Sequence, residues 1–161
     1  MDKRIDQIHQ LTREAVKGVF HSMLSLEINP ESPSPLTPDP EGHIIGSVGF
    51  TGGATGIIYL YAGVGFARVI TSRFLGIPEE EVDPDEMVND AIGELSNMVV
   101  GYVKSHLCDA GLSCTMTVPA VARGKELRVE SPPQVSRRLI GFHNCTHHLL
   151  AEVLLKDSSA K

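Results

Sequence analysis

The sequence predicts an α+β fold, with a largely antiparallel sheet flanked by helices. Two segments carry apolar residues at every third or fourth position, which indicates long helices near the amino terminus and in the middle of the chain. Around them lie short runs rich in β-branched and aromatic residues, joined by glycine-rich or polar turns that are typical of hairpins. With 161 residues, 42% of them hydrophobic, we expect a single domain over residues 1–161.

The first helix is predicted from Ile5 to Leu26, where apolar residues recur with helical spacing. It is followed by NPESPSPLTPDPEG, whose prolines fix φ and remove backbone donors. We therefore expect no regular element in this stretch. Because apolar segments flank it on both sides, we interpret residues 30–42 as a Pro-rich surface loop within the domain.

The segment HIIGSVGFTGGATGIIYLYA has two apolar runs around a glycine-rich centre, which predicts a hairpin. Its GFTGGATG centre lacks the Lys-Ser/Thr pair of a phosphate-binding loop and leads into a strand, so we interpret it as a turn. A second helix is expected from about Gly65 to Leu75.

A third helix has a strong start signal in IPEEEVDPDEM. Asp83 can cap the helix, Pro84 suits its first position and Glu86 can complete a capping box, so we predict a helix from about Pro84 to Cys108. Four later segments are predicted as strands, and the last two as a hairpin. They are SCTMTVPAVAR, KELRVES, RRLIGFH and HHLLAEVLL.

The third helix has a polar side opposite its predicted core face. With an advance of about 100° per residue, the apolar residues from Val88 to His106 centre on one side, and a Glu, an Asn and a Gly share the other. We call this second side the exposed stripe. The residues that fall on it or border it are Asp90, Gly93, Glu94, Asn97, Gly101 and Lys104.

Two glycines inside a helix need a reason, because each costs about 1 kcal/mol of helix stability relative to Ala. Gly101 lies one turn beyond Asn97, where its missing side chain would let another molecule approach the amide. The alternative is that Glu94 and Asn97 are ordinary solvated residues and that the glycines are merely tolerated.

The stretch ELSNMVVG fits the pattern E-x-x-N-x-x-x-G, and the sequence here resembles the chemotaxis phosphatases of the CheC/CheX/FliY group. DAIGELSNMVVG is similar to the CheX version over its whole length. The resemblance extends to IIGSVGFTGGATGIIYLY, FLGIP and TVPAVARG, and so covers roughly residues 43 to 125 in the family's order. It implies a CheC/CheX-like fold.

The resemblance also implies an activity, the dephosphorylation of a phosphorylated CheY-like response regulator. By match of motif, Asn97 orients the water that attacks the aspartyl phosphate, and Glu94 contacts the regulator's active-site lysine. Gly101 gives clearance, and Asp90, Gly93 and Lys104 belong to the surface that the partner approaches. No cofactor is expected on this chain, because the regulator supplies the Mg²⁺ ion.

Members of the group with two motifs carry a second one on another helix. Here the first helix reads EAVKGVFH, with Lys17 and His21 in the diagnostic places, so one stripe is expected. This favours the CheX type, which resembles a homodimer joined edge to edge through its sheet. The sequence itself adds only that it ends in strands whose edge would otherwise be unpaired.

Two other functions stay open at this point. The same stripe could belong to a non-catalytic dimeric binding module for a response regulator or a flagellar-switch component. In HNCTHH, a straight strand would put His143, Cys145 and His147 on one face, as in a metal-dependent sensor. However, NCT is typical of a hairpin tip and zinc-finger spacing is absent, so we expect no metal.

Composition excludes several partners. The net charge is −6 and the basic residues are scattered, so nucleic acid is not expected. No run approaches the roughly 20 apolar residues of a membrane span, and the amino terminus does not resemble a signal peptide. The three cysteines lack CxxC spacing, as in reduced thiols. We expect a cytoplasmic protein that binds neither membranes nor nucleic acid.

Overall fold

The computed structural model of the protein describes residues 3–125, 127, 129–130 and 132–157. Its α+β fold confirms the prediction, because the strands of the described residues form one antiparallel sheet. The strand order is β1-β6-β7-β3-β2-β4, and β5 pairs with the same strand, β2, as β4 does. The strands are β1 (Asn29–Glu31), β2 (His43–Gly52), β3 (Gly56–Gly63), β4 (Cys114–Met116), β5 (Ala120–Gly124), β6 (Val135–Asn144) and β7 (His147–Lys156). The helices are α1 (Lys3–Val19), α2 (Val64–Leu75) and α3 (Glu86–Asp109), with a π-helical turn η1 (Phe20–Leu24) and a 3₁₀ turn η2 (Glu79–Glu81).

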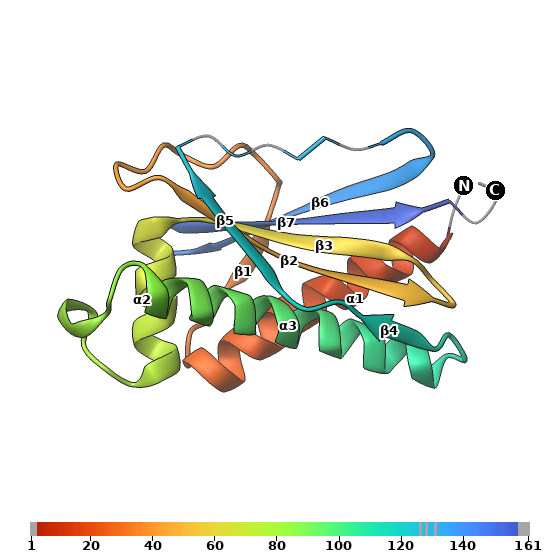
Figure 1. The fold of residues 1–161 in the computed structure, drawn as a ribbon, viewed down its shortest axis with the longest axis horizontal. Coiled ribbons are helices and arrows are strands. Elements are labelled where there is room, and N and C mark those ends of the chain that lie inside the picture. Colours follow the sequence, from red (N-terminus) through yellow and green to blue (C-terminus); the bar gives the residue numbers. More distant parts are fainter. Residues whose placement is uncertain (1–2, 126, 128, 131, 158–161) are drawn as a thin grey trace.

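The three α-helices lie on one side of the sheet, and the Pro-rich segment after β1 passes over the other side (Figure 1). Side chains that alternate along each strand therefore enter two different environments. On β3, Ile58 and Leu60 belong to the main core beneath the helices, and Tyr61 is buried on the opposite side. No helix in the described part of the chain is long and apolar enough to cross a membrane.

The predictions for the first two helices and for both hairpins are confirmed. The first helix continues from α1 into η1 and ends at Ser25, which adopts a positive φ of 51°. The glycine-rich centre of the first hairpin is the turn between β2 and β3. The second hairpin turns at Cys145, which has a φ of 51°, so NCT is its tip.

The prediction that no regular element forms in NPESPSPLTPDPEG was wrong at its start. Asn29–Glu31 forms β1, which pairs with β6 and ends the sheet at that edge. Pro30 is compatible with this position, because an edge strand uses only one side of its backbone for the ladder. Residues 32–42 contain no helix or strand, as predicted.

The third helix begins at Glu86 and not at Pro84. The N-cap residue is Asp85 and not Asp83 as predicted, and the Asp85 side chain makes no capping hydrogen bond. The Asp83 carboxylate still accepts the first N–H of the helix, since the Glu86 N–H donates to Asp83 Oδ2 at 3.0 Å. The capping box does not form, because the Asp83 N–H points to Met87 Sδ at 3.3 Å.

The predicted strand SCTMTVPAVAR is interrupted. It forms β4 and β5 with a break at residues 117–119, and both halves pair with β2. The predicted strand KELRVES is absent from its described residues, which are Lys125, Leu127, Val129 and Glu130. Residues 126, 128 and 131 of that prediction lie outside the described residues.

Candidate functional site

The exposed stripe lies on the side of α3 that faces away from the sheet. Glu94 and Asp90 are exposed and Asn97 is partly exposed. Leu95 and Val99, on the opposite face of the helix, are fully buried. At Gly101, an added Cβ would meet no atom within 4 Å, so the space above this glycine is open. Glu94, Asn97 and Gly101 thus lie together on an accessible helix face, as helical geometry predicted.

The two polar side chains at the centre of the stripe are not engaged by the rest of the protein. In the described part of the chain, neither the Glu94 carboxylate nor the Asn97 amide forms a hydrogen bond or an ion pair. A carboxylate offers only acceptors, and an amide offers both donors and an acceptor. Their full hydrogen-bonding capacity is therefore available to another molecule.

The amino-terminal end of α3 is held in place by β5. Arg123 on this strand donates from Nη1 to the Pro84 carbonyl oxygen at 2.7 Å and reaches Asp85 Oδ1 at 3.2 Å. About three turns further along, Ser96 is buried against β2 and donates its hydroxyl to the Ile92 carbonyl oxygen at 2.8 Å. These contacts fix the rotation of the helix, so the stripe points outward.

One flank of the stripe is formed by α1. Tyr102 packs between the two helices, with its hydroxyl 3.5 Å from Glu14 Oε2 and its ring 4.2 Å from the ring of His106. Partial burial, followed by the nearby Glu14 carboxylate, raises the pKa of Tyr102 above its ordinary value. The prediction that His106 belongs to the core face was wrong, because its ring is exposed. The helix runs alongside α1 there, and its last buried residue is Leu107.

The opposite flank is formed by the chain between β4 and β5. Gly93 is buried beneath this segment, and a Cβ added to it would lie 3.7 Å from Pro119 Cβ and 3.6 Å from Val121 Cγ2. Gly93 therefore borders the stripe from below and is not part of its accessible surface, which corrects the sequence interpretation. Lys104, at the other end, is partly exposed.

The same segment is fastened to the sheet by Thr117. The Thr117 N–H donates to the Gly49 carbonyl oxygen at 2.9 Å, and the Gly49 N–H donates to Thr117 Oγ1 at 2.9 Å. Thr117 belongs to TVPAVARG and Gly49 to the first predicted hairpin, and the sequence indicated no role for either residue. Nothing in the local pattern indicated that this segment lies beside α3, because both elements are positioned by packing on β2, which is distant from them in the sequence.

The first helix does not provide a second stripe. Lys17 is exposed, and His21 faces Glu27, with His21 Nδ1 2.5 Å from Glu27 Oε1. Glu14 supplies the carboxylate of the E-x-x-N-x-x-x-G pattern here, but Lys17 and His21 stand where its Asn and Gly would be.

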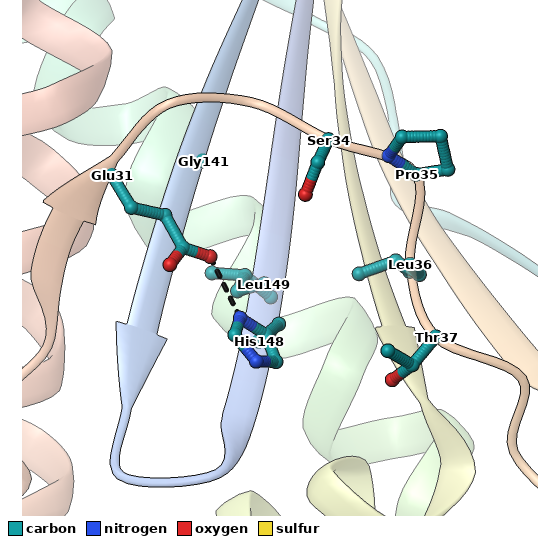
Figure 2. Close-up of a pocket in the computed structure, with 8 residues that line it drawn as sticks. All are labelled: Glu31, Ser34, Pro35, Leu36, Thr37, Gly141, His148 and Leu149. Carbon is teal, nitrogen blue, oxygen red and sulfur yellow. Dashed lines mark hydrogen bonds and ion pairs between the residues drawn. The ribbon is translucent and has the colours of Figure 1, made fainter.

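The histidine-rich hairpin is occupied by internal contacts. His147 stacks on Phe66 with a ring separation of 4.7 Å, and His148 Nδ1 lies 2.7 Å from Glu31 Oε1. Figure 2 shows this second contact in a pocket of about 50 Å³, over which the Pro-rich segment passes. Within the described ranges, no three His, Cys, Asp or Glu side chains are grouped as metal ligands would be.

A wider groove of about 720 Å³ lies on the side of the sheet away from the stripe. It is bounded by the Pro-rich segment, by Tyr61 and by Lys125. The Tyr61 hydroxyl donates to Glu152 Oε1 at 2.7 Å, and Arg137 pairs with the other oxygen of this buried carboxylate. The polar groups beside the groove therefore satisfy one another.

Comparison with known proteins agrees with this arrangement. Residues 44–143 match the family described as chemotaxis phosphatase CheX. The chain is 28% identical over 119 residues to the CheY-P phosphatase CheX of Thermotoga maritima, which covers 73% of this chain and 76% of the relative.

Solved structures show the same fold. The chemotaxis protein CheX from Desulfovibrio desulfuricans superposes with a TM-score of 0.79 at 22% identity, covering 93% of this chain and 99% of that one. A CheX-CheY-BeF3-Mg²⁺ complex from Borrelia burgdorferi gives a TM-score of 0.76 at 19% identity, covering 93% and 98% of the two chains.

Proposed function

Because this chain belongs to the chemotaxis phosphatase CheX family, we propose that it hydrolyses the aspartyl phosphate of a CheY-like response regulator. The observation that carries the proposal is the pair of unengaged side chains on α3, the Glu94 carboxylate and the Asn97 amide, one turn apart on an accessible face. A phosphorylated protein can reach both groups at once.

Asn97 would orient the attacking water. An aspartyl phosphate is an activated acyl phosphate, so the missing part of the reaction is placement of the nucleophile in line with the bond that breaks. The water oxygen attacks phosphorus and the bond from phosphorus to the aspartate oxygen breaks. The products are a free carboxylate and inorganic phosphate. The Asn97 amide can accept a hydrogen bond from this water and needs no charge of its own.

The metal ion would come with the regulator. The relative from Borrelia burgdorferi is a complex of CheX, CheY, BeF3 and Mg²⁺. A divalent cation on the regulator neutralises charge on the phosphoryl group during transfer. The role of this chain would be to orient the attacking water.

Glu94 would dock onto the lysine of the regulator's active site. A carboxylate-to-ammonium contact is charge-assisted, and partial burial between two proteins strengthens it and fixes its direction. Gly101 leaves open space one turn beyond Asn97. Asp90 and Lys104 extend the contact surface along the helix, and Gly93 lets the β4–β5 segment lie close beside it.

We further propose that the protein is a homodimer joined through sheet edges. One edge is the three-residue β1 with its proline, and the other carries β4 and β5. The second edge offers more unpaired backbone groups, which would be satisfied by a second copy. Light scattering on the purified protein measures the oligomeric state directly.

Phosphate release from a panel of phosphorylated receiver domains tests the function. We expect the protein to accelerate release from its regulator, and Asn97→Ala to abolish the acceleration while keeping the melting temperature. The matched control is Ser105→Ala, an exposed residue further along the same helix, which should keep full activity.

The same assay separates the enzyme from a binding module. A module would bind the regulator trapped with BeF3 and Mg²⁺ without accelerating phosphate release. Unchanged turnover in Asn97→Ala would contradict the role given to the amide, even if the wild-type protein is active.

A further inference from the structure

The segment between β4 and β5 displays an apolar side chain at the surface. Val118 is 84% exposed, which makes it the most exposed large hydrophobic residue in the described part of the chain. The next in order is Leu75 at the end of α2, which is 50% exposed. A single exposed valine needs no explanation by itself, but this one is held in a particular place.

Its neighbours on both sides fix Val118. Thr117 is bonded to Gly49 through its backbone N–H and its Oγ1, and this hydroxyl also lies 3.3 Å from the Val118 carbonyl oxygen. Pro119 follows, and a proline restricts the residue before it to extended conformations. Val118 is therefore presented by a fixed backbone, and little conformational entropy is lost when another molecule covers it.

The fixed position lies beside the exposed stripe. Pro119 contacts α3 at Gly93, the residue before Glu94, with 3.7 Å between Pro119 Cβ and a Cβ built on the glycine. From there the chain runs back toward β4, beside the middle of α3 (Figure 1). Val118, which directly precedes Pro119, therefore lies on the flank of the stripe opposite α1.

We propose that Val118 is a docking residue for the phosphorylated receiver domain and determines part of its affinity. This inference rests on the proposed function. The valine would be covered by an apolar side chain of the receiver domain beside its phosphorylated aspartate, while Glu94 and Asn97 engage the polar centre. Removing one such side chain from an interface should weaken binding about tenfold.

A second copy of the chain fits this valine less well than the receiver domain does. Pairing through the sheet edge would use the unpaired backbone of β4 and β5, and Val118 belongs to neither strand. The N–H of the preceding Thr117 is already bonded to Gly49 within the monomer. Binding of the receiver domain to the stripe would, by contrast, bring its surface directly onto this flank.

The test compares Val118→Ser with the wild-type protein. Phosphate release is measured against the concentration of the regulator, and affinity against the regulator trapped with BeF3 and Mg²⁺. We expect KM and Kd to rise about tenfold with kcat at saturation unchanged, and Val118→Ile to keep wild-type values. Leu75→Ser is the matched control, because it removes an exposed apolar side chain that lies on α2, outside the stripe, and should change neither constant.

The outcomes separate this inference from the proposed function. If the wild-type protein accelerates phosphate release and Val118→Ser keeps its KM and Kd, the docking role of Val118 is overturned and the function stands. If light scattering shows that Val118→Ser dissociates an oligomer, the valine serves self-association, which also overturns the proposal. If the wild-type protein neither binds nor dephosphorylates any receiver domain, both proposals fail together.

Discussion

Gly46 of β2 and Ser96 of α3 are fitted so closely that a methyl group added to the glycine would lie 2.1 Å from Ser96 Oγ. The same methyl group would lie 2.9 Å from Ile92 Cγ2. The helix that carries the site therefore rests directly on the backbone of β2. This contact, together with the ion pair of Arg123 at the start of α3, decides which side of the helix faces outward.

We predict that Gly46→Ala lowers the free energy of unfolding by about 1–3 kcal/mol, because overpacking forces the helix away from the sheet. Ser96→Ala in the same chain should recover part of this loss, since it removes the closest atom. Gly18→Ala on α1 is the control, because its Cβ would meet nothing within 4 Å. Urea unfolding measures all three, and equal stability of Gly46→Ala and wild type would contradict the close fit.

Gly101 should affect activity and stability in opposite directions. Replacing a helical glycine with alanine stabilises the protein by about 0.5–1 kcal/mol, and a Cβ added at Gly101 meets no atom within 4 Å. Gly101→Leu should nevertheless lower kcat/KM for the regulator at least about tenfold, by blocking its approach. Gly18→Leu, which shares the gain in helix propensity, should leave kcat/KM unchanged; a similar loss in both variants would argue against a local block.

Glu94 is predicted to act through binding. Glu94→Gln removes the charge of the contact and should raise KM about tenfold, as expected for a hydrogen bond to a charged group, with a smaller change in kcat. The difference from wild type should shrink at high salt, because screening weakens the ionic contact. Glu80→Gln, an exposed glutamate of η2, serves as the control. A salt-independent loss in Glu94→Gln would be inconsistent with an ion pair.

The buried carboxylate on the other side of the sheet should matter for stability alone. Tyr61→Phe leaves one oxygen of Glu152 without its donor and should cost about 1–3 kcal/mol, with phosphatase activity kept. Tyr59→Phe is the control, because the Tyr59 hydroxyl forms no hydrogen bond in the described part of the chain.

The same tyrosine predicts a loss of stability in alkali. Burial, followed by the hydrogen bond to Glu152, raises the pKa of Tyr61. In the unfolded chain this phenol loses its proton near pH 10, at about its ordinary value, while the folded protein retains it. Stability should therefore fall as the pH rises above this value, and Tyr61→Phe should show a shallower decline in thermal melting.

His9 predicts the opposite dependence near neutral pH. Partial burial lowers its pKa below the ordinary value of 6.5, and the charges of Arg13 and Arg138 lower it further. The unfolded chain then binds a proton that the folded protein takes up only at lower pH, so stability should decrease as the pH falls below 6.5. His9→Gln should reduce this slope in urea unfolding at about pH 7.5 and about pH 5.5. A steeper slope in the variant would contradict the direction of the shift.

Much of the arrangement follows from local sequence. The exposure of Glu94 and Asn97 is a consequence of helical periodicity, and the burial of Leu95 and Val99 on the opposite face follows from the same spacing. The two hairpins were predictable from glycine-rich or polar turns between apolar runs. The hydrogen bond from the first N–H of α3 to Asp83 was predictable because its signal lies within a few residues of the helix start.

Contacts between distant segments were beyond the reach of such patterns. The strand at Pro30 forms because its backbone pairs with the edge of β6, and Gly93 is buried because the segment with Pro119 packs over it. Neither partner is close in sequence, so no local rule indicated them. The split of β4 from β5 likewise reflects the bonds between Thr117 and Gly49.

The sequence by itself determined the class of the fold, the helix that carries the E-x-x-N pattern and the outward direction of its polar side, because these depend on the repeat of the backbone within one element. Only the tertiary structure decided what surrounds that side: α1 on one flank and a fixed, apolar Val118 on the other. The physical reason is that the neighbours of a helix depend on how the three helices and the sheet pack together in one core. That packing involves residues from the whole chain and not from one local segment.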